Sequence, residues 1–248
     1  MSGSAFEREV RRRLQSVASR QVKQGAEAYF KHQVRFLGVK TPGLRAVARD
    51  LWPAFGAQPI GRQTDQALGL LHSPYMEERQ VGVELLYRAR HRIPDRTVIR
   101  LEPVFDKVVS EWGTCDGIAG RFLRPLVHRS PWVRARMLTW SRSANSWRQR
   151  AAAVAFVTEA RHGTHNATIL RICGNLIRNP DRFTQLGMGW VLRELSLADR
   201  DAVTRFLTAH LFLLRREALR YAIEKMPKGE ARRLLRLHQR RSLGARSG

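Results

Sequence analysis

Apolar residues recur every three or four positions along almost the whole chain, and alternating strand-like runs are absent. This spacing places apolar side chains on one face of a helix, where they can be buried together. The sequence therefore predicts an all-α fold. Two stripes are expected to form its core: Leu68, Leu71, Val81, Leu85 and Leu86, then Ala151, Val154, Ala155, Ile169, Ile172 and Leu176.

Proline and glycine divide the pattern into segments of about 10 to 18 residues, which are typical helix lengths. We expect Thr41 to be the N-cap of one helix and Pro42 its first residue, leaving free N–H groups at that terminus. The breaks between helices are expected at Thr41-Pro42-Gly43, Trp52-Pro53, Ser73-Pro74, Ile93-Pro94, Ser130-Pro131 and Asn179-Pro180.

A bulky residue follows a polar turn and opens a new periodic segment at Tyr75, Trp112, Trp147 and Phe183, and residues 215–218 continue the series. The first four are 37, 35 and 36 residues apart. Periods of this size are typical of α-solenoids built from helix pairs, although an all-α chain with short loops can also show one by chance. We expect a HEAT-like helical-repeat solenoid with a concave basic trough. It would form a single domain over residues 1–248, with frayed ends at 1–5 and 243–248.

The chain of 248 residues carries 45 Lys and Arg against 21 Asp and Glu, a net charge of +24. Its hydrophobic content of 43% excludes a disordered polyelectrolyte. In a folded domain with this net charge, the positive side chains repel one another. The excess of positive charge therefore favours a polyanionic partner, most simply nucleic acid. The alternative is that arginine usage reflects the base composition of the coding genome and that many arginines only solvate helix faces.

Several other classes are excluded or disfavoured. No run of about 18 apolar residues could span a membrane, and the first 15 residues lack the apolar segment of a secretory signal. The basic tail 231–248 lacks the aromatic anchors of a membrane-surface helix. Two cysteines, Cys115 and Cys173, cannot staple a fold of this size and fit a reduced compartment. We expect a cytoplasmic, nucleoid-associated monomer without membrane contact.

No cofactor or metal is expected. His162 and His165 lie three residues apart, but no second pair of ligands accompanies them. The two cysteines are isolated, which excludes a cluster held by four thiolates, and the chain has no glycine-rich phosphate loop.

Two segments could carry chemistry. On a helix, Trp112 and Asp116 are four residues apart, so an indole and a carboxylate project side by side with only small residues between them. Taken alone, these residues are more simply interpreted as a tryptophan of the core and an aspartate paired with an arginine. In the second segment, Gly189 beside Trp190 lets another backbone approach closely.

Six segments spread along the chain carry a resemblance to a known family. They are 28–32, 36–42, Trp112 to Asp116, 147–152, 189–194 and 216–218. In order and at similar spacing, they resemble the AlkD-like DNA glycosylases, all-α proteins of HEAT-like repeats, over most of the chain. The resemblance places the catalytic aspartate at Asp116, the active-site tryptophans at Trp112 and Trp190, a backbone-binding arginine at Arg150 and a cleft tyrosine at Tyr29.

The resemblance implies excision of cationic N3- or N7-alkylated purines from duplex DNA, a base excision repair activity, with the lesion left stacked. Relatives remove bulky adducts of DNA-alkylating natural products from their producers' DNA. Lysine occurs only at 23, 31, 40, 107, 225 and 228, an arginine bias that suggests a GC-rich genome and fits such self-resistance.

The residue types suit this chemistry. A purine alkylated at N3 or N7 leaves as a neutral base, so the charge to be stabilised develops on the deoxyribose. A carboxylate and two indole faces can stabilise it, and Asp116 can orient the attacking water. A glycosylase–lyase needs an amine nucleophile, and no lysine lies between Lys107 and Lys225. Lys31 and Lys40 stay open as nucleophiles, but we expect them to contact phosphates. We therefore expect a monofunctional enzyme that uses water.

Contacts to the DNA backbone are expected from basic residues at helix starts and along one helix face. Lys40 and Thr41 precede Arg45 and Arg49 at helical spacing, and Arg148 joins Arg150 at another helix start. Arg193 lies one turn beyond Trp190. Such contacts carry no sequence information and are weakened by salt. For each of these arginines, a solvated helix face is the alternative.

Two other functions stay open at this point. One is a non-catalytic HEAT-like binder of DNA or RNA in which Asp116 is structural. The other is an α-solenoid scaffold for an acidic protein. The preferred adduct, contact of Tyr29 with a lesion, and the conformation of residues 232–246 are also open.

Overall fold

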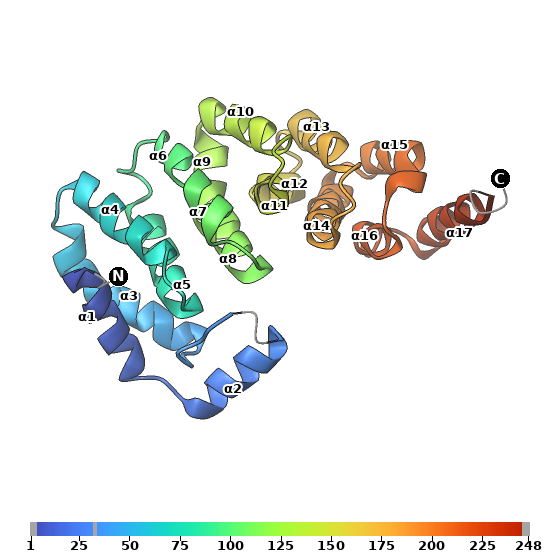
Figure 1. Ribbon diagram of the computed structural model, residues 1–248. Coiled ribbons are helices and arrows are strands. Elements are labelled where there is room, and N and C mark those ends of the chain that lie inside the picture. The colour runs from blue at the N-terminus through green and yellow to red at the C-terminus, as the bar shows by residue number, and fades with distance from the viewer. Residues whose placement is uncertain (1–3, 32–33, 245–248) are drawn as a thin grey trace. The chain divides into compact units, whose positions relative to one another are not determined.

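The computed structural model describes residues 4–31 and 34–244, with side chains through residue 239. Among these residues the chain forms helices and no strand, apart from an isolated bridge between Arg35 and Tyr75. The all-α prediction is confirmed (Figure 1). The chain divides into two compact units, residues 1–126 and 127–248.

In the described part of the first unit, eight α-helices are followed by a π-helix (Figure 1). Phe55, Phe105 and Phe122 are its largest fully buried side chains. The helices are α1 (Ala5–Gln15), α2 (Arg20–Tyr29), α3 (Thr41–Gly56), α4 (Ile60–Leu71), α5 (Met76–Ala89), α6 (Thr97–Arg100), α7 (Glu102–Lys107) and α8 (Trp112–Gly117), and the π-helix covers Ile118–Leu123.

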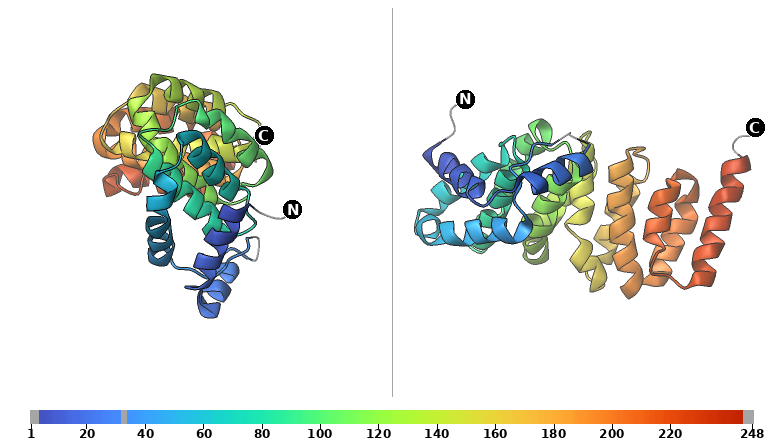
Figure 2. Two further views of the ribbon diagram at one scale, coloured as in Figure 1. Left: turned by 90° about the vertical axis from the view of Figure 1, so that its left-hand side faces the viewer. Right: turned by 90° about the horizontal axis from the view of Figure 1, so that it is seen from below.

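The second unit follows after α9 (Arg124–Arg129), which contains the boundary. Its helices from α14 onward lie side by side in Figure 2, and Trp140 and Phe156 are its largest fully buried side chains. The helices are α10 (Pro131–Trp140), α11 (Ser146–Val154), α12 (Val157–Arg161), α13 (Asn166–Leu176), α14 (Arg182–Ala198), α15 (Arg200–His210), a 3-10 turn (Leu211–Leu213), α16 (Arg216–Ala222) and α17 (Lys228–Gly244).

The predicted repeat is present. Helices α5, α8, α11, α14 and α16, which we call the inner helices, begin at residues 76, 112, 146, 182 and 216, so their starts are 34 to 36 residues apart. Hydrogen bonds recur at the same separation, as in Arg79 to Thr114, Asn179 to Ser146 and Arg182 to Glu217. Stacked repeats in register produce this, because each repeat contacts only its neighbours. Every residue of the two predicted apolar stripes is buried.

Two of the expected helix boundaries are wrong. The N-cap of α3 is Lys40, without a side-chain cap, and Thr41 is already helical. Pro53 does not end α3, which continues to Gly56. The missing N–H of Pro53 faces the carbonyl of Arg49 one turn earlier, and both residues are exposed, so water can hydrate that carbonyl.

The ends expected to fray are partly helical. Ser4 caps α1 in a capping box, in which Ser4 Oγ accepts the Glu7 N–H and the Glu7 carboxylate accepts the Ser4 N–H, both at 3.2 Å. Helix α17 carries the basic tail through Gly244. Residues 1–3 and 245–248 lie outside the described residues.

The close backbone approach expected at Gly189 is also present. A Cβ on Gly189 of α14 would lie 2.7 Å from the carbonyl oxygen of Ala218 in α16. The two inner helices therefore pack against each other with no room for a side chain at this point.

We predict that Gly189→Ala lowers the free energy of unfolding by about 1–3 kcal/mol, because the added methyl group forces the two backbones apart. Urea denaturation of the full chain measures it. The matched control is Gly174→Ala in α13, where a Cβ would meet nothing within 4 Å. It should raise the free energy of unfolding by about 0.5–1 kcal/mol through helix propensity. Equal effects of the two variants would contradict the packing described.

Candidate functional site

Helix α8 carries Trp112 and Asp116 one turn apart, as predicted, and both side chains are half-buried. Glu111 caps the helix, and the π-helix begins directly after Gly117. Short π segments within helices are frequent at functional sites. The pair therefore lies on an accessible edge of a short helix whose continuation is irregular.

Two aromatic side chains at the end of α2 hold the indole of Trp112. Phe30 stacks on it, with ring centroids 5.2 Å apart and planes 20° apart. Tyr29 meets it edge-on at 6.2 Å and is itself 71% exposed. The structure thus brings Tyr29 and Trp112 together, and Phe30 covers one face of the indole.

A cavity of about 320 Å³ lies beside this aromatic group. Its walls come from α2, α3, α5 and α8, and they are mostly apolar. Phe30, Phe36 and Met76 pack together there, Trp112 also lines the cavity, and Thr41, Glu77 and Gln80 supply the polar part.

The loop before α3 is fixed by a buried carboxylate. Glu77 of α5 is 3% exposed and accepts the backbone N–H groups of Leu37, Gly38 and Val39 at 2.8 to 3.1 Å. Gly38 has φ +101°, and a Cβ there would lie 2.3 Å from the carbonyl oxygen of Ser19. These contacts fix the conformation of the loop and thereby the position of Lys40 at the start of α3.

The predicted basic face of α3 is present as a surface. Lys40, Thr41, Arg45 and Arg49 are exposed, beside the face on which α3 buries its apolar residues. Arg49 lies 3.4 Å from Asp50, itself exposed. Contact of this face with DNA stays a prediction.

The second unit holds the other predicted residues. Trp190 of α14 is half-buried, and Arg150 of α11 is 7% exposed, with Nη1 donating to the carbonyl of Phe183 at 2.6 Å. Arg148 is half-buried in the first turn of α11, where its N–H and that of Trp147 bond to the Asn145 side chain. These contacts fix the start of α11.

Arg193 is engaged with protein partners. Its guanidinium pairs with Glu194 at 2.7 Å and Glu224 at 3.1 Å and lies 4.7 Å from the ring centroid of Tyr221. Burial raises the pKa of Tyr221, while the positive charges of Arg193 and Arg150 oppose that shift. A phosphate at Arg193 would therefore compete with two carboxylates.

The sequence-predicted residues fall into two groups, one in each unit. The first has Tyr29, Trp112, Asp116 and the basic face of α3, and the second has Arg148, Arg150, Trp190 and Arg193. Sequence reasoning missed five residues that organise these groups: Phe30, Glu77, Arg79, Glu111 and Tyr221. An acidic residue directly before Trp112 was a usable signal for the cap at Glu111. Nothing distinguished Arg79 from the other arginines.

Within residues 4–31 and 34–244, no three His, Cys, Asp or Glu side chains gather so that they could hold a metal ion. Across the same residues, no helix has both the length and the apolar character needed to span a membrane.

Comparisons with known proteins agree with this fold. Residues 10–226 match the family model described as DNA alkylation repair enzyme. A solved structure described as a predicted DNA alkylation repair enzyme from Enterococcus faecalis matches with a TM-score of 0.76 and 18% identity, covering 85% of this chain and 97% of that one. At this identity the likeness shows the fold. No curated protein matches the chain. Since the family model spans most of the sequence, the chain belongs to the DNA alkylation repair enzyme family, which has a role in DNA repair.

Proposed function

We propose that the protein is a monofunctional DNA glycosylase that hydrolyses the N-glycosidic bond of cationic N3- or N7-alkylated purines in duplex DNA, leaving the base stacked. The observation that carries the proposal is the pair on α8. A carboxylate and an indole lie one turn apart on an accessible helix edge, in a chain of a DNA-repair family.

The proposed chemistry uses these groups on the sugar. As the glycosidic bond breaks, the purine takes the bonding electrons and leaves neutral, and positive charge develops at C1′. The Asp116 carboxylate stabilises that charge and orients the water that adds to C1′, and this water gives up a proton to solvent as the new C–O bond forms. The indoles of Trp112 and Trp190 contribute through cation–π attraction, about 1 kcal/mol each at a partly exposed site. Such modest stabilisation suits a bond that alkylation has already weakened.

Holding the substrate is assigned to the basic residues. The exposed face of α3, with Lys40, Thr41, Arg45 and Arg49, is proposed to contact phosphates, and so are Arg148, Arg150 and Arg193 of the second unit. Tyr29 stands at the exposed edge of Trp112, where it would meet the lesion strand. Because these contacts confine the backbone rather than the base, bulky adducts are proposed as substrates beside methylated purines.

We predict that Asp116→Asn lowers the single-turnover rate of base release by at least about 10²-fold, the size expected when a preorganised charge is removed from a reaction centre. The assay uses duplexes with N7-methylguanine or a bulky N3-alkyladenine, and abasic sites are the readout. Affinity for undamaged duplex should stay unchanged.

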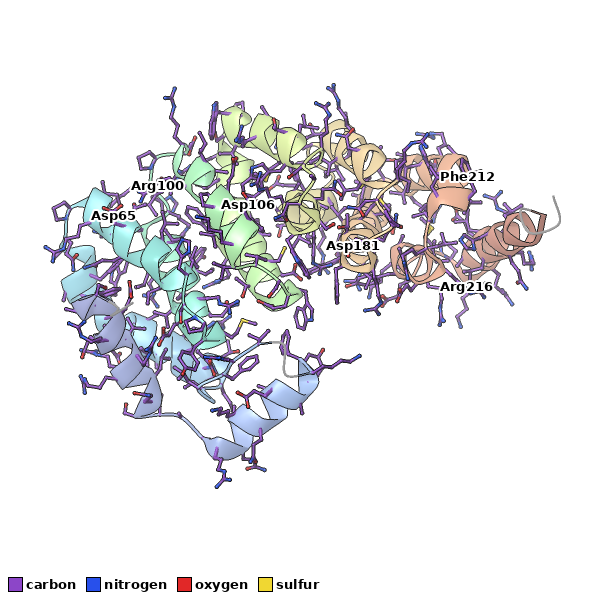
Figure 3. The ribbon with its side chains drawn as sticks, viewed as in Figure 1. Asp65, Arg100, Asp106, Asp181, Phe212 and Arg216 are labelled. Atoms are coloured by element: carbon purple, nitrogen blue, oxygen red, sulfur yellow. The ribbon has the colours of Figure 1, made fainter. Side chains whose placement is uncertain are left out.

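Asp106→Asn is the control, because Asp106 is an exposed residue of α7 (Figure 3). It should act at the wild-type rate. Wild-type protein that binds duplex and releases neither adduct would favour the alternative of a non-catalytic nucleic-acid binder.

We predict that borohydride does not trap the protein on lesion-bearing DNA and that strands break only after alkaline treatment, because water rather than an amine attacks C1′. A glycosylase–lyase run in parallel should be trapped. A covalent complex that disappears in Lys31→Ala or Lys40→Ala would show a lyase and contradict the monofunctional assignment.

We predict that the logarithm of the DNA affinity falls linearly with the logarithm of salt concentration, and that Arg45→Gln reduces the slope by about 1, the value for one lost phosphate contact. Fluorescence anisotropy with undamaged duplex at several salt concentrations measures it. Arg171→Gln on α13, also exposed, is the control and should keep the slope. Equal slopes for Arg45→Gln and the wild type would remove Arg45 from the interface.

A further inference from the structure

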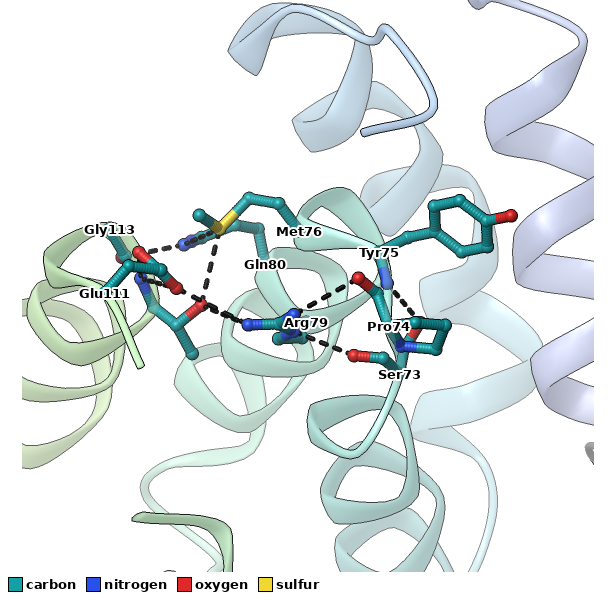
Figure 4. A network of polar contacts seen from close by, with 9 residues as sticks. Ser73, Pro74, Tyr75, Met76, Arg79, Gln80, Glu111 and Gly113 are labelled. Carbon is teal, nitrogen blue, oxygen red and sulfur yellow. Dashed lines mark hydrogen bonds and ion pairs between the residues drawn. The ribbon is translucent and has the colours of Figure 1, made fainter. Parts of the chain in front are cut away.

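Helix α8 is held against α5 by a buried polar network (Figure 4). Its centre is Arg79, whose side chain is 7% exposed. Arg79 Nε donates to the carbonyl of Ser73 at 2.8 Å and Nη2 to that of Pro74 at 3.2 Å. Nη1 donates to Thr114 Oγ1 at 3.2 Å and pairs with the Glu111 carboxylate at 3.4 Å. One guanidinium thus joins the turn before α5 to the first turn of α8.

Glu111 is the N-cap of α8 and is 3% exposed. Both of its carboxylate oxygens accept the Thr114 N–H, at 2.9 and 3.0 Å. A carboxylate favours a helix N-terminus, but burying it is costly unless a cation and hydrogen bonds compensate. Arg79 supplies that cation, so the cap and the guanidinium depend on each other.

The network holds the side of α8 next to the one that carries the candidate pair. Gln80 Nε2 donates to the carbonyl of Gly113 at 3.0 Å and packs on Gly117, where a Cβ would lie 2.8 Å from it. At about 100° per residue, positions 113, 114 and 117 are centred about 130° round the helix from positions 112 and 116. Fixing the first group therefore sets the direction of Trp112 and Asp116.

In two other inner helices, the position that corresponds to Arg79 carries an uncharged residue that makes similar contacts. Arg79 is the fourth residue of α5, and Gln149 and Gln185 are the fourth residues of α11 and α14. Gln149 donates to the carbonyl of Ser143 at 2.7 Å, and its oxygen accepts Asn179 Nδ2 at 2.6 Å.

Gln185 makes the corresponding bonds in α14. It donates to the carbonyls of Ile177 and Asn179 at 3.0 and 3.1 Å and accepts the N–H of Arg215 at 3.2 Å. Each glutamine thus binds backward to the preceding connection and forward to the next repeat. An amide side chain is therefore sufficient to join stacked repeats, whereas the junction beneath Trp112 and Asp116 contains a buried ion pair.

We infer that Arg79 is a positioning residue for the reaction at Asp116: through Glu111 it fixes the first turn of α8 and thereby the placement of Trp112 and Asp116 against the sugar. The inference rests on the proposed glycosylase function. Because the π-helix begins directly after Gly117, regular helix continues on neither side of α8, and the anchored first turn defines its orientation.

The test replaces Arg79 by the residue that other junctions use. Arg79→Gln should lower the single-turnover rate of N7-methylguanine release at least tenfold, while the affinity for undamaged duplex stays within about twofold of wild type. Asn175→Ala is the control, since Asn175 Nδ2 of α13 donates at 2.8 Å to Oγ of Ser141, the C-cap of α10, away from the Arg79 network. It should lower the melting temperature and leave the rate unchanged.

A pH profile separates positioning from a general loss of stability. Burial raises the pKa of Glu111, and its backbone hydrogen bonds and the charge of Arg79 act in the opposite direction. Arg79 is the charged group that α5 places against this carboxylate, and α2 contributes the neutral ring of Phe30 near Gly113. Without Arg79 the pKa rises further, so the rate of Arg79→Gln should increase with pH more steeply than that of wild type. Adding Glu111→Gln should remove this dependence.

Should Arg79→Gln not fold, Arg79→Lys carries the test, because it keeps the charge but cannot bond to Ser73, Pro74 and α8 together. It should lose at least threefold in rate and keep the wild-type pH profile. The inference is overturned if Arg79→Gln, or Arg79→Lys in its place, acts at the wild-type rate, if Asn175→Ala loses as much, or if the pH profile of Arg79→Gln is that of wild type. Failure of the proposed function is distinct, since the wild type itself would then release no base.

Discussion

Buried polar side chains at the junctions between inner helices are the constraint on which the arrangement of each unit depends. A buried hydrogen-bonding group without a partner is costly, so each one admits only the geometry that satisfies it. Apolar stripes bring the helices together, but they tolerate sliding and rotation more readily than a guanidinium that must reach two carbonyls and a carboxylate at once. At the junction of α5 and α8 that requirement is strictest, because both partners of the pair are charged and buried.

Close contacts between neighbouring helices within each unit add to this constraint. Gly82 of α5 faces the carbonyl oxygen of Ala67 in α4, and Gly189 of α14 faces that of Ala218 in α16, each at a distance that excludes a side chain. Short backbone separations and buried polar bonds reinforce each other, since a hydrogen bond of about 3 Å forms only when the helices approach closely. The residues proposed for chemistry therefore stand on helices with little freedom to shift.

The features of the fold that depend on periodicity could be predicted from the sequence. The apolar stripes, the repeat near 35 residues and the placement of Trp112 and Asp116 one turn apart follow from helical spacing, and the structure confirms them. The boundary at Pro53 could not be predicted, because a proline on a solvated face near a helix end costs little. The family, too, was recognisable, since segments spread over most of the chain resemble it in order.

Side-chain partners across repeats were beyond this reasoning. Arg79 and Arg45 look alike in the sequence, yet one is buried in a network and the other lies exposed on α3. Arg150 and Arg193 were expected to face DNA, and both have partners within the protein. Several of these partners, such as Phe183 for Arg150 and Glu224 for Arg193, lie more than 30 positions away, and no local pattern encodes those pairings.

The buried carboxylate of Glu77 fixes the irregular loop before α3, so that the loop is held in place like a part of the core. Three consecutive amides of that loop end on one buried side chain of α5, although the loop has no regular secondary structure. Their hydrogens can exchange with solvent only when the hydrogen bonds to Glu77 open. The start of α3 is thus coupled to the same helix that anchors α8, so a displacement of α5 would affect both the residues proposed to contact phosphates and the pair proposed to act on the sugar.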